Sequence, residues 1–164
     1  MEEENKLAET WEGLVSSPTL QGVDPDEAWY LLGDFCGIQK YHTALATSRR
    51  VEGADGEPGC VRHCVGQEDG EGHAAWAKER LLEMDAAGRS YSYDVMENNM
   101  GIGKYLATFK VVPAAGGGGC GIEWSFKAEP IDGWTRPGFL SYIEGAVGEI
   151  AARVGDALHA NRST

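Results

Sequence analysis

Between residues 46 and 128 the sequence is a succession of strand-length segments, separated by short loops of turn-forming residues. Apolar and polar side chains alternate along these segments with a period of two, which is typical of β-strands that bury one face. The six segments are 46–53, 59–66, 74–85, 89–97, 103–112 and 120–130. With a first strand near residues 6–15, they predict about seven strands joined by hairpin-length loops, and such a sheet is antiparallel.

The last two segments alternate most regularly. One face of each is apolar, and the residues on these faces are Tyr105, Ala107, Phe109 and Val111, followed by Ile122, Trp124, Phe126 and Ala128. The glycine-rich run 114–119 between them indicates a flexible hairpin loop.

The C-terminal region changes to a helical pattern. Thr135 is a candidate cap and Pro137 suits the first turn. Apolar residues recur every three or four positions from Phe139 to Leu158, which predicts a helix of about 25 residues, roughly 37 Å long. Three glycines interrupt the pattern, at Gly145, Gly148 and Gly155. They indicate close contact with the sheet, space left for a bound molecule, or positions merely tolerated at the surface.

A shorter helix is predicted over residues 24–35. Asp24 can cap its N-terminus and Pro25 suits its first turn. Its apolar stripe consists of Ala28, Leu31, Leu32 and Phe35. Two glycines near its end indicate that it is short and broken, with a second turn around residues 38–43.

One strand, a short broken helix, six strands and a long final helix define an α+β architecture in a single domain over residues 1–164, with its core at 6–160. In this arrangement a strongly bent, seven-stranded sheet grips the C-terminal helix. Because the apolar stripe of that helix is too narrow to fill the concave side, the sequence predicts a small-molecule cavity between sheet and helix.

The chain carries 14 basic and 26 acidic side chains, a formal net charge of −12. Such a surface repels phosphate backbones and anionic lipid heads, which disfavours nucleic acid and membranes as partners. No segment approaches the ~20 apolar residues of a membrane span, and the N-terminal sequence is acidic where a secretory leader would be basic. Four cysteines without a leader indicate a reducing compartment, so a cytoplasmic location is expected.

Two charged residues lie on strand faces that are otherwise small or apolar. Alternation places Glu79 on the face of Ala77 and Leu81, and Arg62 on the face of two cysteines. If these faces are concave, the two charges project into an apolar pocket, and the cost of burying either one alone implies that they lie near each other or near tyrosine hydroxyls. Desolvation raises the pKa of such a carboxyl group and a guanidinium lowers it, which suits acid–base chemistry. Alternatively, both lie on the convex face or form only a structural ion pair.

Other motifs in the sequence give little support for a metal, dinucleotide or nucleophile site. Cys60, His63 and Cys64 lack a second ligand pair, so no metal site is expected. Gly101 and Gly103 lie between two strands without a third glycine, which disfavours dinucleotide binding, and there is no nucleophile elbow. The histidines expected to be solvated, in loops or near the chain end, are His42, His73 and His159.

Several segments resemble lachrymatory-factor-synthase-like proteins of plants, in the polyketide cyclase/dehydrase branch of the START and birch-pollen-allergen-like superfamily. These segments are DEAWYLLGDFCGIQKY, VEG, GCVRHC, WAKERLLEMD, SYSYDVMENN, YLATFKVV, IEWSFKAEPIDGWT and the C-terminal helix. They cover about residues 11–158, and the combination of WAKE, SYSY and WSF at these spacings is fairly specific to the family. The resemblance implies a helix-grip fold, which agrees with the architecture predicted from periodicity.

The resemblance also implies an activity. The family's enzyme isomerises a propenyl sulfenic acid to a volatile thial S-oxide without a cofactor or metal. Carried over, Arg62 of the CVR segment would hold the polar oxygen and Glu79 of WAKE would move a proton between heteroatom and carbon. The substrate-binding residues expected from the resemblance and from the strand faces are Tyr93, Tyr105, Trp124, Phe109 and Phe126.

Residues 97–104 and the acidic loop 67–73 differ from the corresponding family segments and flank the expected pocket mouth, so family membership does not fix the substrate. The acidic loop is expected to face solvent or to act as a lid. The first functional hypothesis is a cofactor-free isomerase or cyclase acting on a small sulfenic-acid-like or other polar-headed metabolite. The alternatives are a non-catalytic carrier or sensor of a hydrophobic plant metabolite, with Arg62 as an anion anchor, and a defence-associated cavity that binds many ligands weakly.

Overall fold

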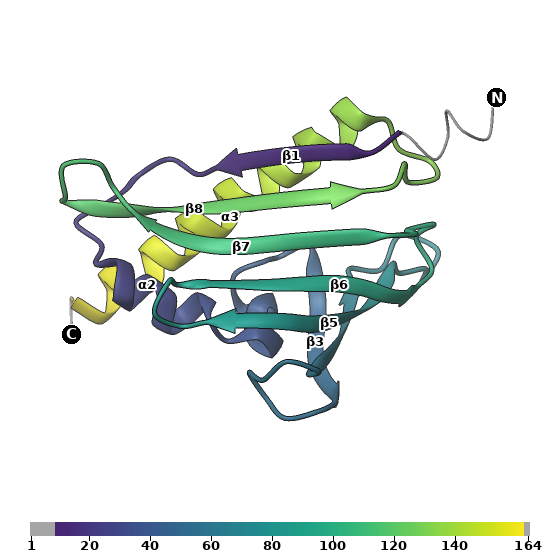
Figure 1. The fold of residues 1–164 in the computed structure, drawn as a ribbon, viewed down its shortest axis with the longest axis horizontal. Helices are drawn as coiled ribbons and strands as arrows, with labels where there is room; N and C mark the ends of the chain where they lie inside the picture. Colours follow the sequence, from purple (N-terminus) through teal and green to yellow (C-terminus); the bar gives the residue numbers. More distant parts are fainter. Residues whose placement is uncertain (1–8, 163–164) are drawn as a thin grey trace.

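The computed structural model describes residues 9–162 as a curved antiparallel sheet crossed by one long helix (Figure 1). The strands run in the order β1-β8-β7-β6-β5-β4-β3, and the two-residue strand β2 pairs with β8. The strands are β1 (Trp11–Ser16), β2 (Leu20–Gln21), β3 (Leu45–Glu52), β4 (Val61–Gly66), β5 (Trp76–Asp85), β6 (Ser90–Asn98), β7 (Tyr105–Pro113) and β8 (Gly119–Ala128). The helices are α2 (Pro25–Leu32), the 3-10 helix η1 (Phe35–Lys40) and α3 (Arg136–Arg162). The predicted α+β architecture is confirmed.

The six strands predicted from alternation begin and end within two residues of their predicted bounds. The first strand was predicted near residues 6–15, of which residues 6–8 lie outside the described part of the chain, and β1 begins at Trp11. Strand β2 was not predicted, because two residues are too few to show an alternation. It continues the pairing of the β1 edge with β8 after Pro18, whose nitrogen has no hydrogen to donate.

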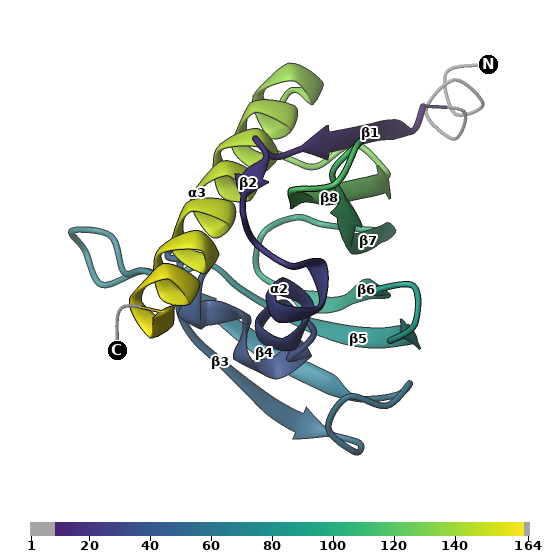
Figure 2. The same cartoon turned by 90° about the vertical axis from the view of Figure 1, so that its left-hand side faces the viewer.

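The concave face of the sheet carries the predicted apolar residues. All eight residues that the sequence placed on the inner faces of β7 and β8 are buried. Register shifts interrupt the pairing of β5 with β6 and of β3 with β4. Such bulges bend strands and increase their twist, and the sheet curls from β1 round to β3 with α3 across its open side (Figure 2).

The helix after the first strand has the predicted start. The Asp24 side chain accepts a hydrogen bond of 2.7 Å from the backbone N–H of Asp26, and Pro25 occupies the first turn. The helix ends at Leu32, however, rather than at Phe35 as predicted. The chain leaves the helical conformation at Asp34 (ψ 89°) and then forms η1. The end of η1 and the turn that follows it lie where the second turn was predicted, around residues 38–43.

The C-terminal helix α3 begins where the sequence predicted. The Thr135 hydroxyl accepts a hydrogen bond of 3.1 Å from the Gly138 N–H. Its apolar stripe is buried against the sheet and α2: Phe139, Ile143, Val147, Ile150, Val154 and Leu158. Added Cβ atoms at Gly145 and Gly148 would meet no neighbour within 4 Å, so neither glycine reflects a close approach to the sheet. Within residues 9–162, no helix is both long and apolar enough to cross a bilayer.

Candidate active site

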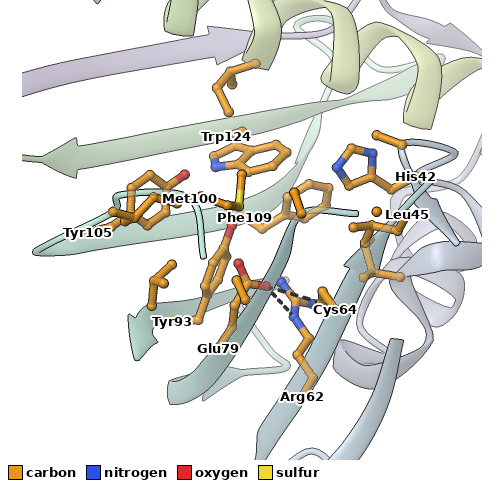
Figure 3. A pocket seen from close by; sticks show the side chains of 18 of the residues that line it. His42, Leu45, Arg62, Cys64, Glu79, Tyr93, Met100, Tyr105, Phe109 and Trp124 are labelled. Atoms are coloured by element: carbon orange, nitrogen blue, oxygen red, sulfur yellow. Dashed lines mark hydrogen bonds and ion pairs between the residues drawn. The ribbon is translucent and has the colours of Figure 1, made fainter. Parts of the chain in front are cut away.

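The concave side of the sheet encloses a cavity of about 160 Å³. Its wall includes inward-facing residues of β4 to β8, residues of η1 and the turn after it, and one side of α3 (Figure 3). Most of the lining is aliphatic or aromatic. The volume is close to that of an engineered cavity of roughly 150 Å³ that stays dry and binds benzene. The cavity therefore has room for a molecule of about one small ring.

Arg62 and Glu79 meet across two neighbouring strands. They are direct partners in the β4–β5 register, and Arg62 Nε donates a hydrogen bond of 2.8 Å to Glu79 Oε1. The Arg62 side chain is 4% exposed and that of Glu79 is 16% exposed. Both residues line the cavity, on the faces to which alternation assigned them.

The protein holds the Arg62 guanidinium on several sides. Its Nη1 donates a hydrogen bond of 2.6 Å to the Phe35 carbonyl, and its central carbon lies 4.0 Å from the centroid of the Phe35 ring and 4.8 Å from that of Tyr93. Burial acts to lower the pKa of Arg62, but the Glu79 carboxylate and nearby tyrosine and thiol groups outweigh it, and the pKa lies well above its usual value. Arg62 therefore stays positively charged throughout the physiological pH range, and its hydrogen bonds hold the guanidinium in place.

Among the described residues, only one of the two carboxylate oxygens of Glu79 accepts hydrogen bonds. Its contacts with Arg62 and with the Cys64 thiol, at 3.6 Å, both end on Oε1. Burial raises the pKa of Cys64 to about 11, so this group is a neutral thiol at pH 7. Within the described residues no hydrogen bond ends on Oε2, which leaves that oxygen for a guest. Because the Arg62 charge balances that of Glu79, the pair is neutral as a whole.

Tyr93 and Tyr105 line the cavity as the sequence predicted. Both are buried, and burial raises the pKa of each hydroxyl above its ordinary value. They are therefore hydrogen-bond donors throughout the physiological pH range. Tyr91, two residues before Tyr93 on the same strand face, also lines the cavity, and the SYSY alternation carried that signal.

Trp124 and Phe109 lie in the cavity wall, but Phe126 does not. The Phe126 ring packs edge-on against Phe139 of α3, with centroids 5.0 Å apart, and stacks beside Tyr105 at 6.3 Å. Phe126 is therefore not part of the cavity wall, where the sequence had placed it. Its strand face is the predicted one, but α3 lies over that end of β8 and fills the space.

The expectation that His42 is solvated is also wrong. His42 lies in the turn after η1, is 7% exposed and lines the cavity. Its ring meets Trp124 edge-on, with centroids 6.2 Å apart. No local pattern signals this burial, because it depends on how η1 and the following turn pack against the rest of the chain. His73, in contrast, is exposed as predicted.

The two loops near the cavity differ in their roles. Residues 67–73 are all exposed and none lines the cavity, so the solvent-facing prediction holds and no lid forms from this loop. In the other segment, 97–104, Met100 and Ile102 contribute to the cavity wall.

The thiols of Cys36 and Cys60 lie side by side. Cys60 Sγ lies 3.6 Å from Cys36 Sγ, and these two sulfurs and an Asp55 carboxylate oxygen all lie within 4.8 Å of one another. Burial and the neighbouring Cys60 raise the pKa of Cys36 to about 12, so this group is a neutral thiol at pH 7.

A curved antiparallel sheet gripping a long helix around a cavity defines the helix-grip class of proteins, and solved structures of this class resemble the chain. The protein XoxI from Bacillus cereus is 20% identical with a TM-score of 0.68, over 90% of this chain and 94% of that one. The ginseng major latex-like protein 151 from Panax ginseng is 17% identical with a TM-score of 0.69, over 90% and 97%. An uncharacterised protein from Bacillus thuringiensis is 18% identical with a TM-score of 0.64, over 91% and 98%. At these identities the likeness shows the fold alone.

Residues 15–161 match a sequence family described as polyketide cyclase/dehydrase and lipid transport. Because the match spans most of the chain, this protein belongs to that family.

Proposed function

We propose that this protein is a cofactor-free isomerase or cyclase that moves a proton on a small, uncharged, polar-headed metabolite, with Glu79 as the base. The observation that carries the proposal is the Glu79 carboxylate, oriented by Arg62 through Oε1 and open at Oε2 towards an apolar cavity. A base acts best when it is held within reach of the proton that it takes and shielded from bulk water.

The two charged residues have separate roles. Arg62 holds the Glu79 carboxylate in position, and two of its five N–H groups bind Glu79 and the Phe35 carbonyl. Its guanidinium also lines the cavity and would hold the polar oxygen of the substrate. Glu79 Oε2 accepts the proton from the heteroatom and returns it to a carbon of the conjugated chain. This transfer is a net isomerisation and consumes no oxidant or reductant.

The size of the cavity supports a small substrate. A volume of about 160 Å³ suits a molecule near the size of benzene. The resemblance to lachrymatory-factor-synthase-like proteins supports a sulfenic acid or a related small molecule of this size. A neutral Arg62–Glu79 pair favours an uncharged substrate over an anionic one.

The test compares the wild type with Glu79→Gln, which keeps the shape of the side chain but removes the base. Each protein is incubated with a propenyl sulfenic acid generated in place and with a plant metabolite extract. General base assistance is worth about 10²–10⁴-fold, so turnover is expected to fall by at least 10²-fold while ligand binding survives. The control is Glu83→Gln, an exposed residue of the same strand. Equal turnover in wild type and Glu79→Gln would overturn the proposal.

A carrier of a hydrophobic metabolite is the second candidate, supported by the apolar lining and by the family description, which includes lipid transport. Since Arg62 is already paired with Glu79, such a carrier would bind a neutral molecule rather than an acid. Native mass spectrometry that finds a retained metabolite, with no product after incubation, would favour this function. The cytoplasmic location stays a prediction from the sequence.

A further inference from the structure

Two cysteines and one aspartate from three segments of the chain meet beside the start of β4. Cys36 belongs to η1, Asp55 to the loop between β3 and β4, and Cys60 directly precedes β4. The two sulfurs are 3.6 Å apart, and both lie within 4.8 Å of an Asp55 carboxylate oxygen. The sequence did not predict this cluster, because the fold rather than local spacing brings the three side chains together. Thiolates and carboxylates are both metal ligands.

The separation of the two sulfurs suits a shared metal ion better than a disulfide. A disulfide requires sulfurs about 2.05 Å apart. In a tetrahedral zinc site with Zn–S bonds of about 2.3 Å, two ligand sulfurs lie about 3.8 Å from each other. The observed distance of 3.6 Å between Cys36 Sγ and Cys60 Sγ is therefore close to the one that a zinc ion between them requires.

The Asp55 carboxylate is placed to supply a third ligand. Asp55 is exposed, and among the described residues its carboxylate forms no hydrogen bond or ion pair. A zinc-bound carboxylate oxygen lies about 3.5 Å from each ligand sulfur, so an approach of about 1 Å by this exposed side chain completes the geometry. Cys36 is half-buried, and an ion can reach the cluster from solvent on this side. Three protein ligands leave the fourth position of a tetrahedral ion to water.

The loop that carries Asp55 is folded tightly against Cys60. The Cys60 N–H donates a hydrogen bond of 2.9 Å to the Glu57 carbonyl. Gly53 has a φ of 75°, and a Cβ at this position would lie 2.7 Å from the Gly59 carbonyl oxygen. This close approach requires glycine. The backbone therefore brings Asp55 to Cys60 before any ion binds, which lowers the cost of forming a site.

The charges of the cluster favour a divalent, thiophilic ion. Two thiolates and a carboxylate carry three negative charges, and a bound cation displaces the protons of thiols that are otherwise neutral. The Arg62 guanidinium lies near Cys36, but Glu79 balances its charge. Sulfur ligands select Zn²⁺ over Mg²⁺ and Ca²⁺, which prefer oxygen ligands throughout.

We propose that Cys36, Asp55 and Cys60 form a zinc site that fastens η1 and the β3–β4 loop to the start of β4. Cys36 follows Phe35, whose carbonyl accepts a hydrogen bond from Arg62, and Cys60 lies two residues before Arg62. The ion therefore stiffens the wall that holds the guanidinium. It is structural, and no step of the proposed reaction uses it, so the inference stands independently of the proposed function.

The test is equilibrium dialysis of the full chain against Zn²⁺ with a phosphine reductant, followed by measurement of bound zinc. The wild type is expected to retain one zinc ion per chain. Cys36→Ser and Cys60→Ala are expected to weaken binding by at least about 10²-fold, since losing even an outer partner of a zinc ligand costs about 10–100-fold. Asp55→Asn is expected to weaken binding less, because it removes only the charge of one ligand. The controls are Cys120→Ser, a thiol outside the cluster, and Glu57→Gln, an exposed carboxyl of the same loop, and both are expected to bind as the wild type does.

A second readout needs only the wild type, so it holds even where a cysteine variant fails to fold. Co²⁺ in place of Zn²⁺ is expected to give thiolate-to-cobalt charge-transfer absorption and the visible bands of a tetrahedral ion. Zn²⁺ is expected to abolish both and to raise the thermal unfolding midpoint. No zinc retained by the reduced wild type, a cobalt spectrum without thiolate bands, or equal zinc affinity in wild type and Cys36→Ser would overturn the inference. A Cys36–Cys60 disulfide formed in air, with no zinc bound by the reduced protein, would also overturn it.

Discussion

Arg62 depends on Glu79 for a partner as much as Glu79 depends on it. Each is largely buried, and each would leave an uncompensated charge if the other were removed. The contacts of Arg62 with the Phe35 carbonyl and ring also tie η1 to β4. The pair therefore contributes to the stability of the cavity wall as well as to its chemistry.

Arg62→Leu is expected to destabilise the protein by about 3–5 kcal/mol, because it leaves the Glu79 carboxylate buried and unpaired. The double variant Arg62→Leu/Glu79→Leu is expected to recover much of the loss. Urea unfolding measures both. Arg80→Leu is the control, since it breaks the exposed Arg80–Asp94 pair one residue along β5 and is expected to change stability little. Wild-type stability in the single Arg62 variant would contradict this account of the pair.

His42 makes stability depend on pH. Burial, together with Arg62, lowers the pKa of His42 in the folded protein, so the unfolded chain takes up a proton at higher pH than the folded one. Stability due to this residue is therefore complete above the ordinary histidine pKa of about 6.5 and is lost as the pH falls towards the lowered value.

Urea midpoints at about pH 7.5 and 5.5 test this dependence, since the two values lie on either side of the ordinary histidine pKa. His42→Phe is expected to lose less stability between them than the wild type, and His73→Phe to behave as the wild type does. The same loss in His42→Phe and in the wild type would show that His42 is not the group responsible.

The sequence predicted some site residues and not others for physical reasons. Strand alternation assigns a face, and it placed Arg62 and Glu79 correctly with respect to their strands. It cannot tell which part of that face another element covers, and so Phe126, which α3 covers, was wrongly assigned to the cavity. It gives no information about His42, whose burial is set by tertiary packing in a turn.

At the scale of the element, signals that recur over many residues gave accurate bounds. The strands of nine or ten residues and α3 repeat their pattern often enough to be located within two residues, whereas η1 and β2 have too few residues to repeat one. The bulges that curl the sheet have no signature in alternation either. The cavity was predicted from the architecture, and its volume became measurable only in the structure.

The start of α2 depends on one side chain. Asp24→Ala removes the acceptor for the Asp26 N–H and is expected to lower the free energy of unfolding by about 1 kcal/mol. Asp24→Asn keeps an acceptor oxygen and is expected to stay near the wild type. Thermal or urea unfolding measures the difference, and an equal loss in both variants would contradict the cap.

At the scale of the molecule, the acidic composition of the chain contrasts with a cavity that is largely apolar. The chain has a net charge of −12, yet the cavity contains one balanced ion pair within a largely apolar wall. The cavity of about 160 Å³ favours a small ligand, and the Glu79 carboxylate in its wall would lie beside that ligand. These features together support the proposal that the protein transfers a proton on a small neutral molecule.

The most direct measurement of that claim follows a proton from solvent to product. In D₂O, the wild type is expected to convert a propenyl sulfenic acid into product with one deuterium on a single face of the carbon that receives the proton. Glu79→Gln is expected to slow this stereospecific incorporation by at least about 10²-fold. Equal rates in the two proteins, or deuterium on both faces with wild type, would contradict Glu79 as the group that moves the proton.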